Sequence, residues 1–309
     1  MTQQGASCNV NLLIIGAAKS GTTTLHDRLS ALPHAYFSPV KEPNFHSRRA
    51  LDPSRFSVAF RANHRADSQF IGFVRTLPDY DRLFEAADPT RHALIGESST
   101  STLFDPAALE SVSALHPGAR ILVALRNPAE RMHSHWGMAR KYGFTGLPFR
   151  AAVERDMASS DPGWGRTELF YELGLYAQQL APWLAVWPSE RLRVVLTEEL
   201  GNPATWRDLA AWLGLDVPAD WAEAAATGRS NAGGRARFDG LNRLLTATGL
   251  KQRLAGALPS PLKRALKSRY YVASDEPLSA ADREWATALY RAEVEALEGL
   301  LGRELRGWK

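Results

Sequence analysis

Residues 10–25 read VNLLIIGAAKSGTTTL, and this stretch decides the fold. An apolar run ends at Gly16 and a helix-compatible sequence begins near Thr22, which predicts a strand, a turn and a helix in succession. Gly16 and Gly21 allow a tight turn whose backbone N–H groups point inward, and a helix start adds free donors and partial positive charge. The stretch therefore predicts an anion cradle, with a strand-to-helix turn that binds nothing as the alternative.

The position of the lysine in this loop indicates which class of anion the loop would bind. A loop that binds a nucleoside triphosphate places lysine directly after the second glycine, followed by Ser or Thr for magnesium. Thr22 occupies that position here, and the lysine lies inside the loop at Lys19. The pattern argues against an ordinary ATPase or kinase and indicates a different phosphoanhydride.

Short apolar runs alternate with helical patterns along the rest of the chain. The expected strands are 11–15, 35–38, 94–97, 121–125 and 192–197, and the expected helices are 22–32, 80–87, 106–115, 128–142, 175–187, 206–213 and 280–301. Such alternation predicts an α/β, P-loop-like, three-layer fold in which helices flank a central parallel sheet. We expect a single domain over residues 1–309, with its core at 10–215 and a helical, basic C-terminal part at 216–309.

Polar side chains follow four of the expected strands. Lys19 follows the first strand, Glu42 the second, Ser98 and Ser99 the third, and Arg126 the fourth. The carboxyl ends of parallel strands meet at one edge of the sheet, and open α/β sheets bind ligands there. We therefore expect these residues to converge, although Arg126 taken alone could equally be a structural ion-pair partner.

Composition bounds the class of protein. The chain has 309 residues, 45% hydrophobic and 23% charged, which are values typical of a globular protein. Its only cysteine, Cys8, permits no disulfide within the chain and favours a reducing cytosol. The apolar run near the N-terminus is too short for a signal peptide or a membrane span. We expect a soluble, cytoplasmic protein with no membrane or nucleic-acid partner.

Charge is unevenly placed along the chain. Residues 235–269 carry a net charge of +8, against +4 for the whole chain, which suits an anionic ligand or a solvated helix face. His133 and His135 do not predict a metal site, because residues two apart do not share a helix face. No acidic pair follows the expected strands, so we expect no metal.

Four segments of the sequence carry a resemblance to a known family. GAAKSGTTTL at 16–25 resembles the 5′-phosphosulfate loop of the sulfotransferases that use 3′-phosphoadenosine 5′-phosphosulfate (PAPS), and LRNPAERMHSHW at 125–136 resembles their 3′-phosphate motif. SPVKEPNFH at 38–46 is similar to the carbohydrate and heparan sulfate branch, which includes many bacterial enzymes. GLYAQQLAPWLAVWPSERLRVVLTEEL at 174–200 looks like the family's helix–strand unit, so the resemblance covers most of residues 10–215.

The resemblance implies a donor site and a fold. Its implied donor-binding residues are Lys19, Ser20, Gly21, Thr22, Thr23, Thr24, Arg126, Ser134, Tyr176 and Arg235. PAPS would be the donor substrate and adenosine 3′,5′-bisphosphate (PAP) the product. Thr102 stands where many members have an aromatic residue near the acceptor, so a carbohydrate and a hydroxylated small molecule both stay open. A homodimer is compatible with all of these features.

Chemistry assigns roles to three residues. Sulfuryl transfer should resemble phosphoryl transfer, a loose in-line displacement that depends on positioning and charge stabilisation. Lys19 would neutralise charge on the leaving phosphate oxygen. Glu42 is the first candidate for the base that takes the acceptor proton, and His46 is the competing base. The alternative role for Glu42 is an ion pair, and the alternative role for His46 is a structural hydrogen bond.

Two other functions are alternatives to a sulfotransferase. They are a small-molecule or nucleoside kinase and a non-catalytic anion-binding or glycan-binding protein.

Overall fold

The computed structural model describes residues 9–48, 50–57, 60, 74–227, 235–236, 271–272 and 276–309. The chain divides into two compact units, and each is built from separate segments of the sequence. We call residues 1–49, 69–126 and 176–230 the sheet unit, and residues 50–68, 127–175 and 231–309 the helical unit. The expected single domain over residues 1–309, with its core at 10–215, stays a prediction.

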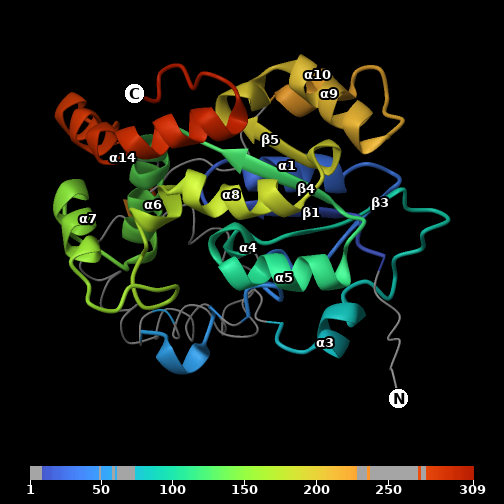
Figure 1. The fold of residues 1–309 in the computed structure, drawn as a ribbon, viewed down its shortest axis with the longest axis horizontal. Coiled ribbons are helices and arrows are strands. Elements are labelled where there is room, and N and C mark those ends of the chain that lie inside the picture. Colours follow the sequence, from blue (N-terminus) through green and yellow to red (C-terminus); the bar gives the residue numbers. More distant parts are fainter. Residues whose placement is uncertain are drawn as a thin grey trace. The chain divides into compact units, whose positions relative to one another are not determined.

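A five-stranded parallel sheet forms the centre of the sheet unit (Figure 1). Its strands are β1 (Leu12–Gly16), β2 (Ala35–Phe37), β3 (Leu94–Ser98), β4 (Arg120–Leu125) and β5 (Leu192–Leu196). They lie in the order β2-β3-β1-β4-β5, and every neighbouring pair is parallel. All five strands expected from the sequence are confirmed, and the buried, apolar central strands β1 and β4 are typical of parallel sheets.

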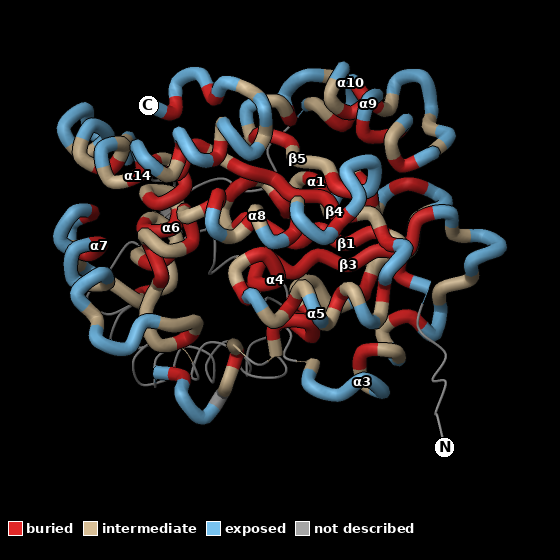
Figure 2. The backbone as a smooth tube through the Cα atoms, viewed as in Figure 1, coloured by how far each residue is buried: buried red, intermediate tan, exposed pale blue. Residues whose placement is uncertain are grey.

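Helices cover both faces of this sheet. On one face, α1 (Thr22–Ser30), α9 (Pro203–Leu213) and α10 (Trp221–Ala226) pack on strand residues such as Leu12, Ile14 and Leu122 in one apolar cluster. The other face carries α4 (Ser101–Phe104), α5 (Pro106–Leu115) and α8 (Tyr176–Val186), which lie together in Figure 1. The central strands β1, β3 and β4 are buried along nearly all of their length (Figure 2), whereas the edge strands β2 and β5 are only partly buried. The expected three-layer arrangement is confirmed.

Local capping sets several helix boundaries. Asp105 accepts the Ala107 N–H at 3.0 Å and starts α5 at Pro106, as expected from the sequence. Asn127 accepts the N–H groups of Ala129 and Glu130 and starts α6 (Pro128–Tyr142). The helix expected at 80–87 instead spans Leu77–Arg82 as α3, because Thr76 caps it three residues earlier. The helix α9 also begins earlier than expected, after the capping residue Asn202.

The helical unit contains α6, α7 (Phe149–Met157) and α14 (Ala280–Leu301), which was expected over the same residues. Tyr290 joins α14 to the segment before α8 by donating its hydroxyl toward the Tyr171 carbonyl oxygen, 2.9 Å away. The unit also holds a two-residue antiparallel pair, β6 (Arg235–Ala236) and β7 (Tyr271–Val272). The short helices α4, α7 and α10 were not expected, because their sequences span few turns.

Short 3₁₀ turns connect the longer elements. They are η1 (Pro53–Arg55), η2 (Glu172–Gly174), η3 (Ser189–Arg191) and η4 (Thr197–Gly201). Within the described ranges, no helix combines the length and the apolar character needed to cross a lipid bilayer.

Candidate active site

The loop between β1 and α1 has the backbone that an anion cradle requires. Gly21 takes φ 95° at the N-cap of α1, and no side chain caps that helix. A Cβ at Gly21 would lie 2.7 Å from Leu200 Cδ1, so both the backbone angle and the space favour glycine. Lys19 also takes a positive φ, 68°. The first N–H groups of α1 therefore have no side-chain acceptor at the N-cap, as in helix termini that bind anions.

Two neighbouring strands hold this loop in place. Ala17 donates its N–H to the Ala124 carbonyl oxygen on β4 at 2.6 Å. The Thr197 hydroxyl lies 2.7 Å from the Ser20 carbonyl oxygen and 3.0 Å from that of Leu125, so the residue after β5 bridges the loop and the end of β4. The sequence prediction did not include Thr197. Its position as the last residue of the expected strand 192–197 is the signal that could have found it.

Glu42 lies in a loop after β2 that is bonded to the end of β3. Its N–H donates to the Ser98 carbonyl oxygen at 2.9 Å, and its φ is 55°. Asn44, also at φ 55°, donates its side-chain amide to the Glu42 carbonyl oxygen at 2.7 Å and its backbone N–H to Ser99 Oγ at 3.1 Å. Left-handed backbone at non-glycine residues costs of order 1 kcal/mol and persists only where surrounding bonds impose it. These bonds fix the position of Glu42.

The carboxyl group of Glu42 lies among cations. Burial raises its pKa above the usual carboxyl value, and the charge on Lys41, a hydrogen bond from Thr100 and the charge on Lys19 offset only part of this rise. The Thr100 hydroxyl lies 3.3 Å from Glu42 Oε2. The structure thus brings Lys19 and Glu42, residues from two separate motifs, into one electrostatic environment at the expected edge of the sheet.

His46 lies in a buried polar cluster and is only 2% exposed. Its Nδ1 lies 3.0 Å from Ser111 Oγ and its Nε2 lies 3.2 Å from Tyr80 Oη, so both ring nitrogens have partners. Burial, followed by the charges of His116 and Arg48, holds the pKa of His46 well below its usual value. The imidazole is therefore neutral near pH 7.

The structure adds two groups that the sequence prediction missed. Glu97 on β3 is 1% exposed, and burial raises the pKa of its carboxyl to about 8, against hydrogen bonds from Tyr80 and Ser99. His26 on α1 lies 2.9 Å from Ser98 Oγ through its Nδ1, and burial followed by the charge of Lys41 lowers its pKa to about 4. The signal for Glu97 was a carboxylate inside an expected buried strand.

The residues expected at the 3′-phosphate belong to different parts of the chain. Arg126 directly follows β4, and Tyr176 at the start of α8 donates its hydroxyl to the Arg126 carbonyl oxygen at 3.0 Å. Ser134 lies on α6 in the helical unit. The pairing of Arg126 with Ser134 stays a prediction. The side chain of Arg235, most of the basic segment 235–269 and Cys8 lie outside the described residues.

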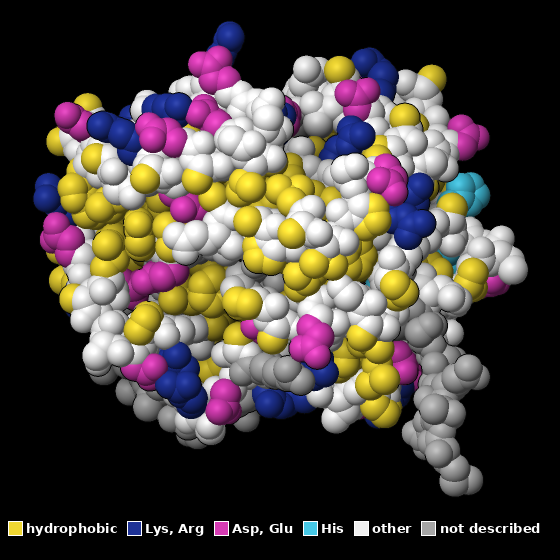
Figure 3. Space-filling view, in the orientation of Figure 1, with side chains coloured by type: hydrophobic (Ala, Val, Ile, Leu, Met, Phe, Trp, Pro, Cys, Tyr) yellow, Lys and Arg dark blue, Asp and Glu magenta, His cyan; other side chains and the backbone are white. Residues whose placement is uncertain are grey.

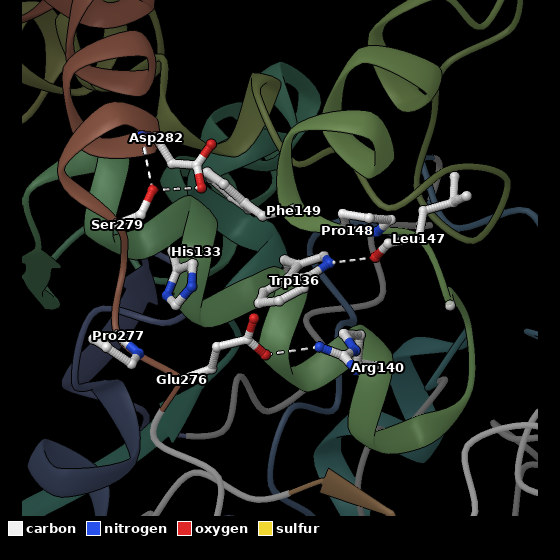
Figure 4. A pocket seen from close by; sticks show the side chains of 11 residues that line it. His133, Trp136, Arg140, Leu147, Pro148, Phe149, Glu276, Pro277, Ser279 and Asp282 are labelled. Atoms are coloured by element: carbon white, nitrogen blue, oxygen red, sulfur yellow. Dashed lines mark hydrogen bonds and ion pairs between the residues drawn. The ribbon is translucent and has the colours of Figure 1, made fainter.

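The helical unit has a pocket of its own, of about 280 Å³ (Figure 4). Arg140 forms an ion pair with Glu276 at 2.9 Å there, and its guanidinium carbon lies 4.9 Å from the Trp136 ring centre. None of the residues expected to bind the donor lines this pocket. In the part of the chain that the structure describes, no three His, Cys, Asp or Glu side chains are grouped as a metal site would need.

Comparison with known proteins shows the family to which this chain is similar. Residues 10–202 match the family model described as the sulfotransferase domain. Carbohydrate sulfotransferase 15 of Rattus norvegicus is 25% identical over 229 residues, covering 62% of this chain and 41% of that protein. The bifunctional heparan sulfate N-deacetylase/N-sulfotransferase 2 of Bos taurus is 28% identical over 199 residues, covering 62% of this chain and 20% of that protein. The chain thus spans less than half the length of these curated relatives.

A solved structure extends the likeness to nearly the whole chain. The sulfotransferase from Alicyclobacillus acidocaldarius is 25% identical, with a TM-score of 0.67, over 97% of this chain and 98% of that one. Its fold agrees with the parallel sheet and helical C-terminal part described above. With the family model matched over more than half of its residues, the chain belongs to the sulfotransferase domain family.

Proposed function

We propose that this chain transfers a sulfuryl group from PAPS to a hydroxyl group of a carbohydrate or small-molecule acceptor. The observation that carries the proposal is the approach of Lys19 and Glu42 at one sheet edge, close enough for the lysine charge to lower the pKa of the carboxyl. A cation beside a carboxylate base is what transfer of a charged group to a hydroxyl needs. Family membership supports the same chemistry.

The loop from Lys19 to Thr24 would hold the 5′-phosphosulfate of the donor. The uncapped N-terminus of α1 and the left-handed Gly21 fit an anion at this position. Arg126 and Ser134 would bind the 3′-phosphate, with Tyr176 and Arg235 nearby. The tyrosine supports this assignment by fixing the backbone at Arg126.

The transfer step follows from these positions. The acceptor oxygen forms a bond to sulfur while the bond from sulfur to the phosphate oxygen breaks, and PAP leaves with the electron pair. Lys19 stabilises the charge that develops on the leaving oxygen. Glu42 takes the proton of the acceptor hydroxyl. We favour Glu42 over His46 as the base because both ring nitrogens of His46 have partners and the ring is buried.

The proposed acceptor is a carbohydrate or a hydroxylated small molecule. A carbohydrate is favoured by the names of the curated relatives, and the hydroxyl-rich segment after β3, which ends near Thr102, is compatible with a smaller acceptor as well. The proposal includes a cytoplasmic bacterial enzyme, supported by the single cysteine. A homodimer is part of the proposal that light scattering can test.

Two measurements test the proposed function. Because a ligand stabilises the fold that it binds, PAP should raise the melting temperature and ATP with magnesium should not. Sulfate transfer from labelled PAPS should then appear in a screen of carbohydrate and phenolic or alcoholic acceptors. Stabilisation by ATP with magnesium alone would instead favour the kinase alternative. PAP binding without transfer to any acceptor class would favour the non-catalytic alternative.

A further inference from the structure

Lys41 is a cation at this site to which neither the sequence motifs nor the proposed mechanism gives a role. It lies in the loop after β2, next to Glu42, and is half-buried. Its Nζ lies 2.5 Å from Thr23 Oγ1, in the first turn of α1. The side chain thus reaches from the loop that carries the proposed base to the loop that would hold the donor.

The surroundings of Lys41 are rich in positive charge. The N-terminus of α1 carries partial positive charge, so an ammonium group beside its first turn is unfavourable unless an anion is also present. Lys19 from the phosphate loop and Lys41 both act on the Glu42 carboxyl, and Lys41 has the larger effect on its pKa. One carboxyl group among these charges leaves room for a further anion.

Two other titratable groups in the described part of the sheet unit, His26 and Glu97, are mostly uncharged near pH 7. His26 on the same helix has a pKa of about 4 because of burial and then the charge of Lys41, so its ring is neutral. Glu97 on β3 faces Glu42 as well and has a pKa of about 8, so it mostly keeps its proton at pH 7. Thr100 contributes a hydroxyl group to Glu42. Burial opposes the ionisation of Glu42, whereas the charge of Lys41, the Thr100 hydrogen bond and the charge of Lys19 favour it.

We propose that Lys41 is a further catalytic residue, whose ammonium group binds the sulfuryl oxygens of the donor beside the carboxyl group of Glu42. This inference rests on the function proposed above. Lys19 stabilises charge on the phosphate oxygen that leaves, whereas Lys41 acts at the group that is transferred and at the base. The proton of the acceptor hydroxyl goes to Glu42, and Lys41 keeps its own protons throughout the step.

The test compares Lys41→Gln with Lys41→Arg, which keeps the charge. Arg91→Gln is the matched control, because it removes an exposed positive charge elsewhere in the sheet unit. In Lys41→Gln we expect kcat to fall at least about tenfold, in line with the loss of a charge-stabilising group. PAP lacks the sulfuryl group that Lys41 would bind. The dissociation constant of PAP should therefore change less than about threefold, which is a small change in binding free energy. Lys41→Arg should recover part of kcat.

The pH profile separates this role from a structural one. Removing Lys41 removes a charge that lowers the pKa of Glu42, so the acidic limb of kcat/KM should move to higher pH in Lys41→Gln and stay in place in Arg91→Gln. An unchanged limb and unchanged kcat would overturn the inference. A loss of PAP affinity as large as the loss of kcat would also overturn it, since Lys41 would then bind the nucleotide. Failure of the unaltered chain to transfer sulfate would instead refute the proposed function.

Discussion

At the scale of single residues, the site depends on side chains held on unusual backbone. Lys19 and Glu42 take φ angles of 68° and 55°, a region in which non-glycine residues are uncommon. Such angles often occur where a site needs a side chain in one fixed direction. In this chain the two residues belong to the same electrostatic environment, and this supports a role in chemistry for both.

Lys19→Ala should lower turnover sharply while the protein stays folded. Alanine keeps a Cβ at the same φ angle, so the substitution removes the ammonium group without relieving the backbone. We expect kcat to fall by about 10²–10³-fold, as when one group that stabilises transition-state charge is removed. Steady-state kinetics with a thermal melt as the folding control checks this. Near-normal turnover would exclude the proposed role of Lys19.

Glu42→Gln and His46→Ala should have opposite consequences. Glu42→Gln keeps the size of the side chain but cannot take a proton, so transfer should be abolished while PAP still binds. His46→Ala leaves the Tyr80 and Ser111 hydroxyls without their buried partner, which should cost about 1–3 kcal/mol of stability and leave most activity in the folded fraction. Turnover, PAP titration and urea denaturation of both variants provide the comparison. An active Glu42→Gln variant beside a folded but inactive His46→Ala variant would reverse the assignment of the base.

At the scale of elements, the site lies where the loops after parallel strands meet. The loops after β1 and β2 are each bonded to a neighbouring strand or to the segment that follows it. Lys41 adds a side-chain contact between the β2 loop and α1. The start of α1 is therefore the element that contacts both the loop after β1 and the loop that carries Glu42.

Gly21→Ala should damage this element more than Gly214→Ala damages α9. Both glycines have positive φ at a helix end, 95° and 69°. Only at Gly21 would a new Cβ meet a neighbour, Leu200 Cδ1 at 2.7 Å, whereas the space around Gly214 is open. We expect Gly214→Ala to cost about 1 kcal/mol from backbone strain alone, and Gly21→Ala to cost more and weaken PAP binding. Equal losses of stability with unchanged PAP affinity would contradict this account of the loop.

At the scale of the whole molecule, each unit contains one carboxyl group with a pKa of about 8, raised mainly by burial. These groups are Glu97 in the sheet unit and Glu168 in the helical unit. The unfolded chain releases these protons near the ordinary carboxyl value, whereas the folded chain keeps them to higher pH. The stability that they contribute is therefore fully present at low pH and is lost as the pH rises through about 8. Burial acts in the opposite direction on His26, His46 and His116, whose lowered pKa values make the fold less stable at acidic pH.

Glu97→Gln should make stability less dependent on pH. Its amide cannot ionise, so between pH 5 and pH 9 its free energy of unfolding should fall less than that of the unaltered chain. Glu168→Gln should change the pH dependence of stability less, because the Glu168 side chain is 26% exposed whereas Glu97 is only 1% exposed. Urea denaturation at a series of pH values measures both. If the free energy of unfolding of Glu97→Gln and of the unaltered chain changed with pH in the same way, Glu97 would already be ionised at neutral pH.

The sequence by itself determined where the strands lie, that they form a parallel sheet, and which loop follows the first strand. It did so because buried strands, two glycines and a displaced lysine leave a local pattern in VNLLIIGAAKSGTTTL and in the other apolar runs. Capping residues such as Asp105 and Asn127 likewise fix helix starts from neighbouring residues alone. The convergence of Lys19 and Glu42 was also predictable, since parallel strands end at one edge.

Only the tertiary structure decided how that edge is charged. The burial of His46 and Glu97, the left-handed backbone of Glu42 and the bridge made by Thr197 depend on residues far apart in the chain. The contact of Lys41 with Thr23 has the same origin, because it joins two loops that only the sheet brings together. Desolvation and charge proximity are properties of packing in three dimensions, and for that reason no motif in the sequence records them.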